Sequence, residues 1–148
     1  MNGLSHIGTA SSLVSGAEAL LRQGNLEEAT QNIYDADCIL KLVGGMRSLE
    51  IRIKWSLARL SACRSDYVRA ISRYENLIEE HQKNFGIDYK RLRTLNCELG
   101  DVYRDLGDMR KAEYYYKAGF ATASRKTKLL TDTVNVSAWL VYGSLTRF

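Results

Sequence analysis

Apolar residues recur along this chain in alternating steps of three and four, the spacing that places side chains on one stripe of an α-helix. The clearest stripes run over residues 26–43, 49–60, 67–77, 92–106 and 109–116. No segment alternates strictly between apolar and polar residues, as a half-buried strand would. The chain is therefore predicted to be all-α.

Small residues recur in two series, one near the middle of the first helix of each predicted pair and one early in the second helix. The first series is Ala17, Ala58, Gly100 and Gly143, and the second is Ala29, Ala70 and Ala112. A small side chain at such a point lets two antiparallel helices approach closely, while larger residues fill the space around it. The second series repeats after 41 and then 42 residues, which indicates a helical repeat.

Turns are predicted where a glycine or serine precedes an asparagine or aspartate, at Gly24-Asn25, Ser65-Asp66 and Gly107-Asp108. Glycine is a permissive residue just after a helix, and Asn or Asp can accept from the free N–H groups of the next helix. The chain contains no proline. We therefore expect glycine to end the second helix of a pair, at Gly44-Gly45 and at Gly86, with Asp88 as the N-cap that follows.

The third of these units resembles the tetratricopeptide repeat, in which the first helix (helix A) carries L-G-x-x-Y and the second (helix B) a small residue and then an aromatic one. The matching residues are Leu99, Gly100, Tyr103, Gly107, Asp108, Ala112 and Tyr116. The interval of 41–42 residues exceeds the standard unit of about 34 and is similar to the repeats of kinesin light chains and related adaptors. Lys54, Asn96 and Gly119 depart from the family pattern.

The resemblance implies one domain over residues 1–148, a right-handed superhelix of antiparallel helix pairs. Three repeats are expected over about 9–44, 46–86 and 88–126, and a capping helix over about 129–146.

In this superfamily the A helices line a concave wall that binds peptides or partner helices. Carrying those positions over selects Val14, Glu18, Leu21 and Arg22, then Arg52, Trp55, Arg59 and Ala62, then Cys97, Asp101, Arg104 and Asp105. The predicted partner-binding residues among them are Glu18, Arg22, Arg52, Trp55, Arg59, Asp101, Arg104 and Asp105. Arginine grips carboxylates through a forked set of donors, and tryptophan is enriched at binding hot spots. A shift of one residue would instead make Trp55 a packing residue, and both interpretations stay open.

Charge and candidate chemistry change this picture little. The net charge of +4 is mild, and the basic clusters Lys90-Arg91-x-Arg93 and Arg125-Lys126-x-Lys128 lie near helix ends, so nucleic-acid binding is not expected. No catalytic, phosphate-binding or metal-binding motif occurs, and no cofactor is predicted. The carboxylates Glu98, Asp101 and Asp105 share a helix face that we interpret as solvated.

The three cysteines, Cys38, Cys63 and Cys97, form no CxxC pair and are expected to be small core residues. No membrane span or secretory signal is predicted, and these features together indicate an intracellular protein, cytoplasmic or nuclear.

The leading hypothesis is a non-enzymatic adaptor or scaffold that binds a peptide or helical segment of another protein in the groove lined by the A helices. The alternative is a structural or self-associating segment of a larger helical-repeat assembly, a possible homo-oligomer that uses its C-terminal end.

Overall fold

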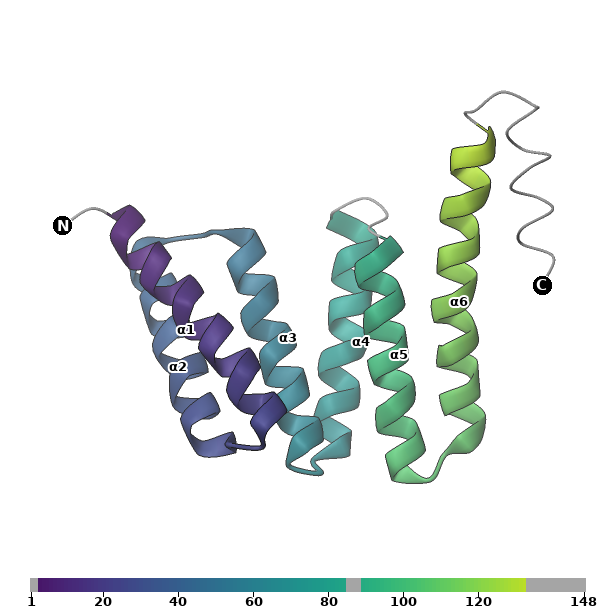
Figure 1. The fold of residues 1–148 in the computed structure, drawn as a ribbon, viewed down its shortest axis with the longest axis horizontal. Coiled ribbons are helices and arrows are strands. Elements are labelled where there is room, and N and C mark those ends of the chain that lie inside the picture. Colours follow the sequence, from purple (N-terminus) through teal and green to yellow (C-terminus); the bar gives the residue numbers. More distant parts are fainter. Residues whose placement is uncertain (1–2, 85–88, 133–148) are drawn as a thin grey trace.

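The structure is a computed structural model that describes residues 3–84 and 89–132, with side chains described for 5–83 and 89–121. Within this part of the chain there are six α-helices and no strand, which confirms the all-α prediction. The helices are α1 (Gly3–Gln23), α2 (Leu26–Val43), α3 (Arg47–Cys63), α4 (Tyr67–Asn84), α5 (Tyr89–Leu106) and α6 (Met109–Asp132). They form three antiparallel pairs that lie side by side in chain order (Figure 1).

The turn within each pair has the predicted chemistry. Asn25, Asp66 and Asp108 each accept a hydrogen bond, through a side-chain oxygen, from the backbone N–H three residues further on, at 3.5, 3.3 and 3.1 Å. These bonds satisfy N–H groups that have no partner inside the new helix. The local signals for the starts of α2, α4 and α6 are thereby confirmed.

The residue before each of these caps has a positive φ. Gly24 and Gly107 adopt φ of 80° and 92°, and Ser65 takes the same place in the α3–α4 turn with φ of 59°. Only glycine enters this left-handed region without a steric cost, so Ser65 holds a strained backbone. Gly44 also has a positive φ of 83°, and its N–H donates to the carbonyl of Leu40, so it ends α2 as predicted.

The small residues predicted at helix contacts are buried in both series. Ala17, Ala29, Ala58, Ala70 and Ala112 are completely buried, and Gly100 is buried as well. The contact at Gly100 is the closest, since a Cβ there would lie 2.7 Å from the ring of Tyr116. Helix α6 can therefore approach α5 at this point only because residue 100 has no side chain.

The core consists of two clusters that share α3. The first joins α1 and α2 to Leu49, Ile53 and Leu60, and the second joins Ile51 and Ala58 to α4, α5 and α6. The two sets alternate along α3, so opposite sides of this helix face different clusters. α3 is the element that connects the two halves of the molecule.

The middle pair, α3–α4, is held partly by polar contacts. Figure 1 shows these two helices diverging away from their turn. Lys54 of α3 donates to Glu50 and to Glu80 of α4, with Nζ–oxygen distances of 2.8 and 3.0 Å. A second pocket of about 270 Å³ lies beside it. The contact between Lys54 and Glu80 therefore joins α3 to α4.

Several boundaries differ from the prediction. α1 already includes Gly3, whereas the first repeat was expected from about residue 9. α6 runs unbroken to Asp132, so the predicted break between residues 126 and 129 is wrong. The expected stop at Gly86, the cap at Asp88, and the terminal helix from residue 133 onward, with Gly143, lie outside the described residues.

Candidate functional site

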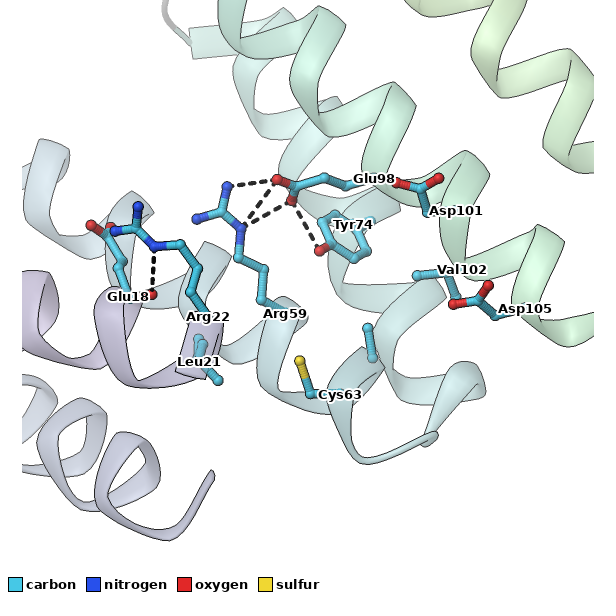
Figure 2. A pocket seen from close by; sticks show the side chains of 11 residues that line it. Glu18, Leu21, Arg22, Arg59, Cys63, Tyr74, Glu98, Asp101, Val102 and Asp105 are labelled. Carbon is cyan, nitrogen blue, oxygen red and sulfur yellow. Dashed lines mark hydrogen bonds and ion pairs between the residues drawn. The ribbon is translucent and has the colours of Figure 1, made fainter. Parts of the chain in front are cut away.

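A pocket of about 520 Å³ opens on the face of the molecule formed by α1, α3 and α5 (Figure 2). All three predicted A helices contribute to it, and α4 adds Tyr74. Below it is called the groove pocket. Its lining residues are Glu18, Leu21, Arg22, Arg59, Ala62, Cys63, Tyr74, Glu98, Asp101, Val102 and Asp105. Its volume lies within the range of about 300–1,000 Å³ that is typical of ligand pockets.

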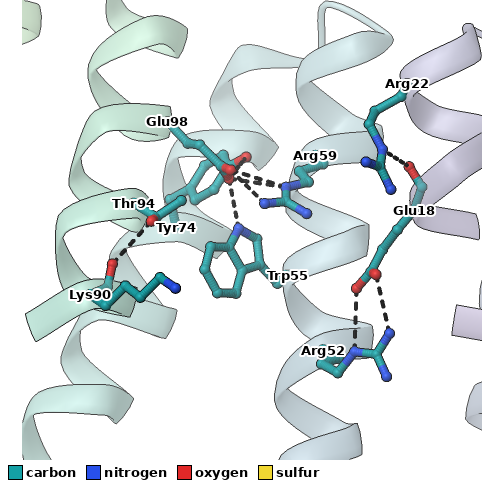
Figure 3. A network of polar contacts seen from close by, with 9 residues as sticks. All are labelled: Glu18, Arg22, Arg52, Trp55, Arg59, Tyr74, Lys90, Thr94 and Glu98. Carbon is teal, nitrogen blue, oxygen red and sulfur yellow. Dashed lines mark hydrogen bonds and ion pairs between the residues drawn. The ribbon is translucent and has the colours of Figure 1, made fainter. Parts of the chain in front are cut away.

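Glu98 is the centre of a network of polar contacts (Figure 3), and its residues Arg59, Tyr74 and Glu98 line the groove pocket. The Glu98 carboxylate of α5 accepts from Trp55 Nε1 at 2.6 Å, from Arg59 Nη2 at 2.6 Å and from the Tyr74 hydroxyl at 3.0 Å. The Arg59 guanidinium also lies over the Trp55 ring, 4.8 Å from its centroid. These four residues, called the Glu98 network below, join α3, α4 and α5 through one carboxylate.

Burial and the charge of Glu98 change the pKa values of two members of this network, Tyr74 and Arg59. Tyr74 is only 2% exposed, and burial, together with the neighbouring Glu98, raises the pKa of its hydroxyl. Burial disfavours the charged form of Arg59, but the hydrogen bonds and charge of Glu98 outweigh it and raise the pKa of Arg59. Arg59 is therefore charged at neutral pH, and Tyr74 is neutral and donates its hydroxyl proton to Glu98.

A second ion pair joins α1 to α3. Arg52 Nη2 lies 3.1 Å from Glu18 Oε2, and its Nε lies 3.3 Å from Oε1. The same guanidinium donates to the hydroxyls of Ser11 and Ser15. Both charged side chains remain partly accessible to water.

The acidic side of the groove pocket is on α5. Arg104 donates to Asp101 at 2.9 Å and to Asp105 at 3.2 Å, so two carboxylates share one guanidinium. Asp101 also accepts from the Tyr116 hydroxyl at 2.7 Å. Asp105 and Arg104 are exposed.

Three of the four arginines predicted to grip carboxylates do so, but the carboxylates belong to this chain. Arg52 binds Glu18, Arg59 binds Glu98, and Arg104 binds Asp101 and Asp105. Among the described residues Arg22 alone of the four has no carboxylate partner. Its Nε donates to the backbone carbonyl of Glu18.

The structure also decides where the remaining candidates lie. Trp55 is half-buried against the second core cluster and is not among the residues that line the groove pocket, which favours the packing interpretation. Val14 is completely buried in the first cluster, where no ligand reaches it, so its place on the wall was predicted wrongly. Cys97 lies beneath Gly119, outside the pocket. Cys63 was expected in the core but is exposed and lines the pocket.

Sequence reasoning missed Glu98, Tyr74, Cys63 and Val102 as residues of this site. The repeat interval could have indicated Glu98. Subtracting the interval of 42 residues places Glu98 level with residue 56, between Trp55 and Arg59 of the preceding helix A. Tyr74 gave no such signal, because its position on the buried stripe of a B helix predicts only packing.

The described residues include no group of three or more histidine, cysteine, aspartate or glutamate side chains that could hold a metal ion. None of the described helices is long and apolar enough to cross a membrane. The chain matches no protein-family model, no curated protein and no solved structure.

Proposed function

We propose that this chain is a non-enzymatic adaptor that holds a peptide or a helical segment of another protein in the groove pocket. The observation that carries the proposal is that α1, α3 and α5 line one open pocket that combines apolar residues with charged ones. Such a combination gives a ligand both buried area and fixed orientation.

The resemblance to tetratricopeptide repeats supports the proposal. In that superfamily the A helices line the wall that binds partners, and α1, α3 and α5 are the helices that correspond to them here. The buried small residues at Ala17, Ala58 and Gly100 agree with that correspondence.

The chemistry of the pocket favours binding over catalysis. Each of its carboxylates is in an ion pair: Glu18 with Arg52, Glu98 with Arg59, and Asp101 and Asp105 with Arg104. A pocket lined by such paired charges is suited to recognising the charge of a ligand.

Selection from a phage-displayed library of random peptides tests this proposal. We expect the library to yield peptides that bind the wild-type chain. The Arg22→Glu variant should bind them at least about tenfold more weakly, because charge-assisted hydrogen bonds are each worth about 1.5–3 kcal/mol. Arg110→Glu is the matched control, since Arg110 is exposed on α6 and does not line the pocket. No enrichment, or equal loss in both variants, would contradict a binding role for the groove pocket.

Self-association is a second candidate, because α6 exposes two large side chains, Tyr114 and Phe120, at 67% and 61%. Large exposed apolar side chains favour contact with another copy of the chain. Light scattering tests this candidate: a dimer that persists on dilution and is lost in Phe120→Ser supports it, and a monomer at all concentrations excludes it.

A further inference from the structure

We propose that the groove pocket selects a bipolar segment, one that presents an acidic side chain to Arg22 and Arg59 and a basic side chain to Asp101 and Asp105. An apolar side chain lies between the two charges. This inference rests on the proposed function and states the chemistry of the partner.

The basic side of the pocket has donors to spare. Arg22 is exposed, and only its Nε has a hydrogen-bond partner within the described residues, the Glu18 carbonyl at 3.2 Å. Arg59 uses Nε and Nη2 on Glu98, which leaves its Nη1 for another acceptor. Figure 2 shows the two guanidinium groups on the same side of the pocket.

The carboxylates nearest to these arginines do not cancel this capacity. Both Glu18 oxygens accept from Arg52, and both Glu98 oxygens accept from the donors of the Glu98 network. An incoming carboxylate can therefore add to Arg22 and Arg59 Nη1 without displacing an existing partner. Guanidinium groups bind carboxylates in this forked way.

The opposite side of the pocket carries an excess of negative charge. Asp101 and Asp105 together hold two charges against the single guanidinium of Arg104, which bonds to one oxygen of each. The other oxygen of each carboxylate has no hydrogen-bond partner among the described residues. A lysine or arginine of a ligand fits here, whereas an acidic side chain would be repelled.

The lining of the pocket also includes the apolar side chains of Leu21, Ala62 and Val102. A pocket of about 520 Å³ is on the order of 10 Å across, comparable with the Debye length of about 10 Å at 0.1 M salt. Each charge of a bound ligand therefore interacts with the charged residues on both sides of the pocket. A uniformly acidic or uniformly basic segment gains on one side and loses on the other, which is how charge placement produces specificity.

The test is a comparison of peptides selected from a random phage-displayed library by four forms of the chain. These are wild type, Arg22→Gln, Asp105→Asn and the double charge exchange Arg22→Asp with Asp105→Lys. We expect wild type to enrich peptides that carry an acidic and a basic residue on either side of an apolar one. Each single variant should bind those peptides about tenfold more weakly, and the exchanged variant should enrich the reverse order of charges.

The controls are Arg110→Gln and Glu27→Gln, which neutralise exposed charges on α6 and α2 and should leave affinity unchanged. Circular dichroism confirms that every variant is folded. If peptides are enriched but only their acidic residues matter, or Asp105→Asn binds as well as wild type, the bipolar inference is overturned while the binding function stands. If the folded wild-type chain enriches no peptide, both fail.

Discussion

Helix α3 meets α1 and α5 in different ways. At the first junction, between α1 and α3, the two helices pack directly and both contribute to the first core cluster. At the second junction, between α3 and α5, the helices do not pack closely along their described lengths, and α5 rests on α4 instead. Each junction nevertheless contains one ion pair between arginine and glutamate, Arg52–Glu18 and Arg59–Glu98.

The two ion pairs are alike in exposure but not in what depends on them. Arg52 and Glu18 are 32% and 26% exposed, and Arg59 and Glu98 are 34% and 23% exposed. The first pair joins two helices that already pack directly against each other. The other acceptors of Arg52 are the hydroxyls of Ser11 and Ser15, which are accessible to water. The second carries the indole N–H of Trp55 and the buried hydroxyl of Tyr74 as well. The comparison teaches that the contribution of an ion pair depends on the neighbours that would lose a partner with it.

The largest effect is expected from Glu98→Ala. The change leaves the Trp55 and Tyr74 donors without an acceptor and Arg59 without its counter-charge, and each unsatisfied buried group costs about 1–3 kcal/mol. Because Arg59 is about one-third exposed, water recovers part of the loss, and we expect the free energy of unfolding to fall by about 2–4 kcal/mol. Urea unfolding followed by circular dichroism measures it.

Glu18→Ala is the matched control at the first junction. It should cost at most about 1 kcal/mol, the usual contribution of an exposed ion pair. Equal costs for Glu18→Ala and Glu98→Ala would show that the two junctions are equivalent, contrary to the structure.

Two glycines, Gly100 and Gly16, allow the packing of the α5–α6 pair to be compared with that of the α1–α2 pair. In Gly100→Ala the new Cβ would lie 2.7 Å from the Tyr116 ring, and overpacking costs typically about 1–3 kcal/mol. The gain in helix propensity, about 1 kcal/mol, offsets part of this, so a net loss of up to about 2 kcal/mol is expected. At Gly16 the new Cβ meets only the end of the Asn32 side chain at 3.1 Å, so the same gain in helix propensity should leave stability unchanged or raise it by up to about 1 kcal/mol.

Thermal unfolding of the two alanine variants decides this point. A larger loss at Gly16 than at Gly100 would mean that α1–α2, and not α5–α6, is the more closely packed pair.

A smaller effect, of opposite sign, is expected at the turn that ends α3, the helix common to both junctions. Ser65 has a φ of 59° where the other two turns have glycine. Ser65→Gly should raise the free energy of unfolding by about 0.5–1 kcal/mol, because relief of the left-handed strain exceeds the entropy that glycine adds to the unfolded chain. Denaturant midpoints measure it, and Gly107→Ser should lower stability by a similar amount. Destabilisation by Ser65→Gly would contradict the strain.

The last prediction concerns stability at alkaline pH, to which Tyr115 contributes. The burial of its hydroxyl and the neighbouring Glu75 raise its pKa to about 12, from about 10 in the unfolded chain. The folded state thus holds this proton more tightly, so the contribution is complete below about pH 10 and is lost as the pH rises towards 12. Tyr115→Phe should reduce the loss of stability over this window, as urea midpoints at each pH would show. An unchanged pH dependence would exclude Tyr115 as a cause.

The elements of the fold could be predicted from the sequence because their signals are local. The caps at Asn25, Asp66 and Asp108 and the glycines at 24 and 107 act on backbone groups only a few residues away. Burial of the small residues follows from the repeat interval. At the ends of stripes, where packing fades, the same reasoning failed: Leu106 and Met109 flank the last turn and are exposed.

The pairing of charges could not be predicted in the same way. Glu18 and Arg52 are 34 residues apart and Arg59 and Glu98 are 39 apart, whereas the repeat interval is 41 or 42. The first pair is therefore offset by about two helical turns and the second by about one. The two offsets differ because the helices cross differently at the two junctions. A long side chain can reach several charged residues, and the sequence alone does not show which of them it will pair with.

The division of α3 between two core clusters couples the folding of the two ends of the chain. Repeat proteins behave as a row of units in which each is stabilised by its neighbours. Here the shared unit is one helix, with Leu49 and Ile53 on one side and Ile51 and Ala58 on the other. If α3 unfolds, both clusters lose a wall together, so a defect at either end is transmitted through the middle and the described helices should unfold as a single cooperative block.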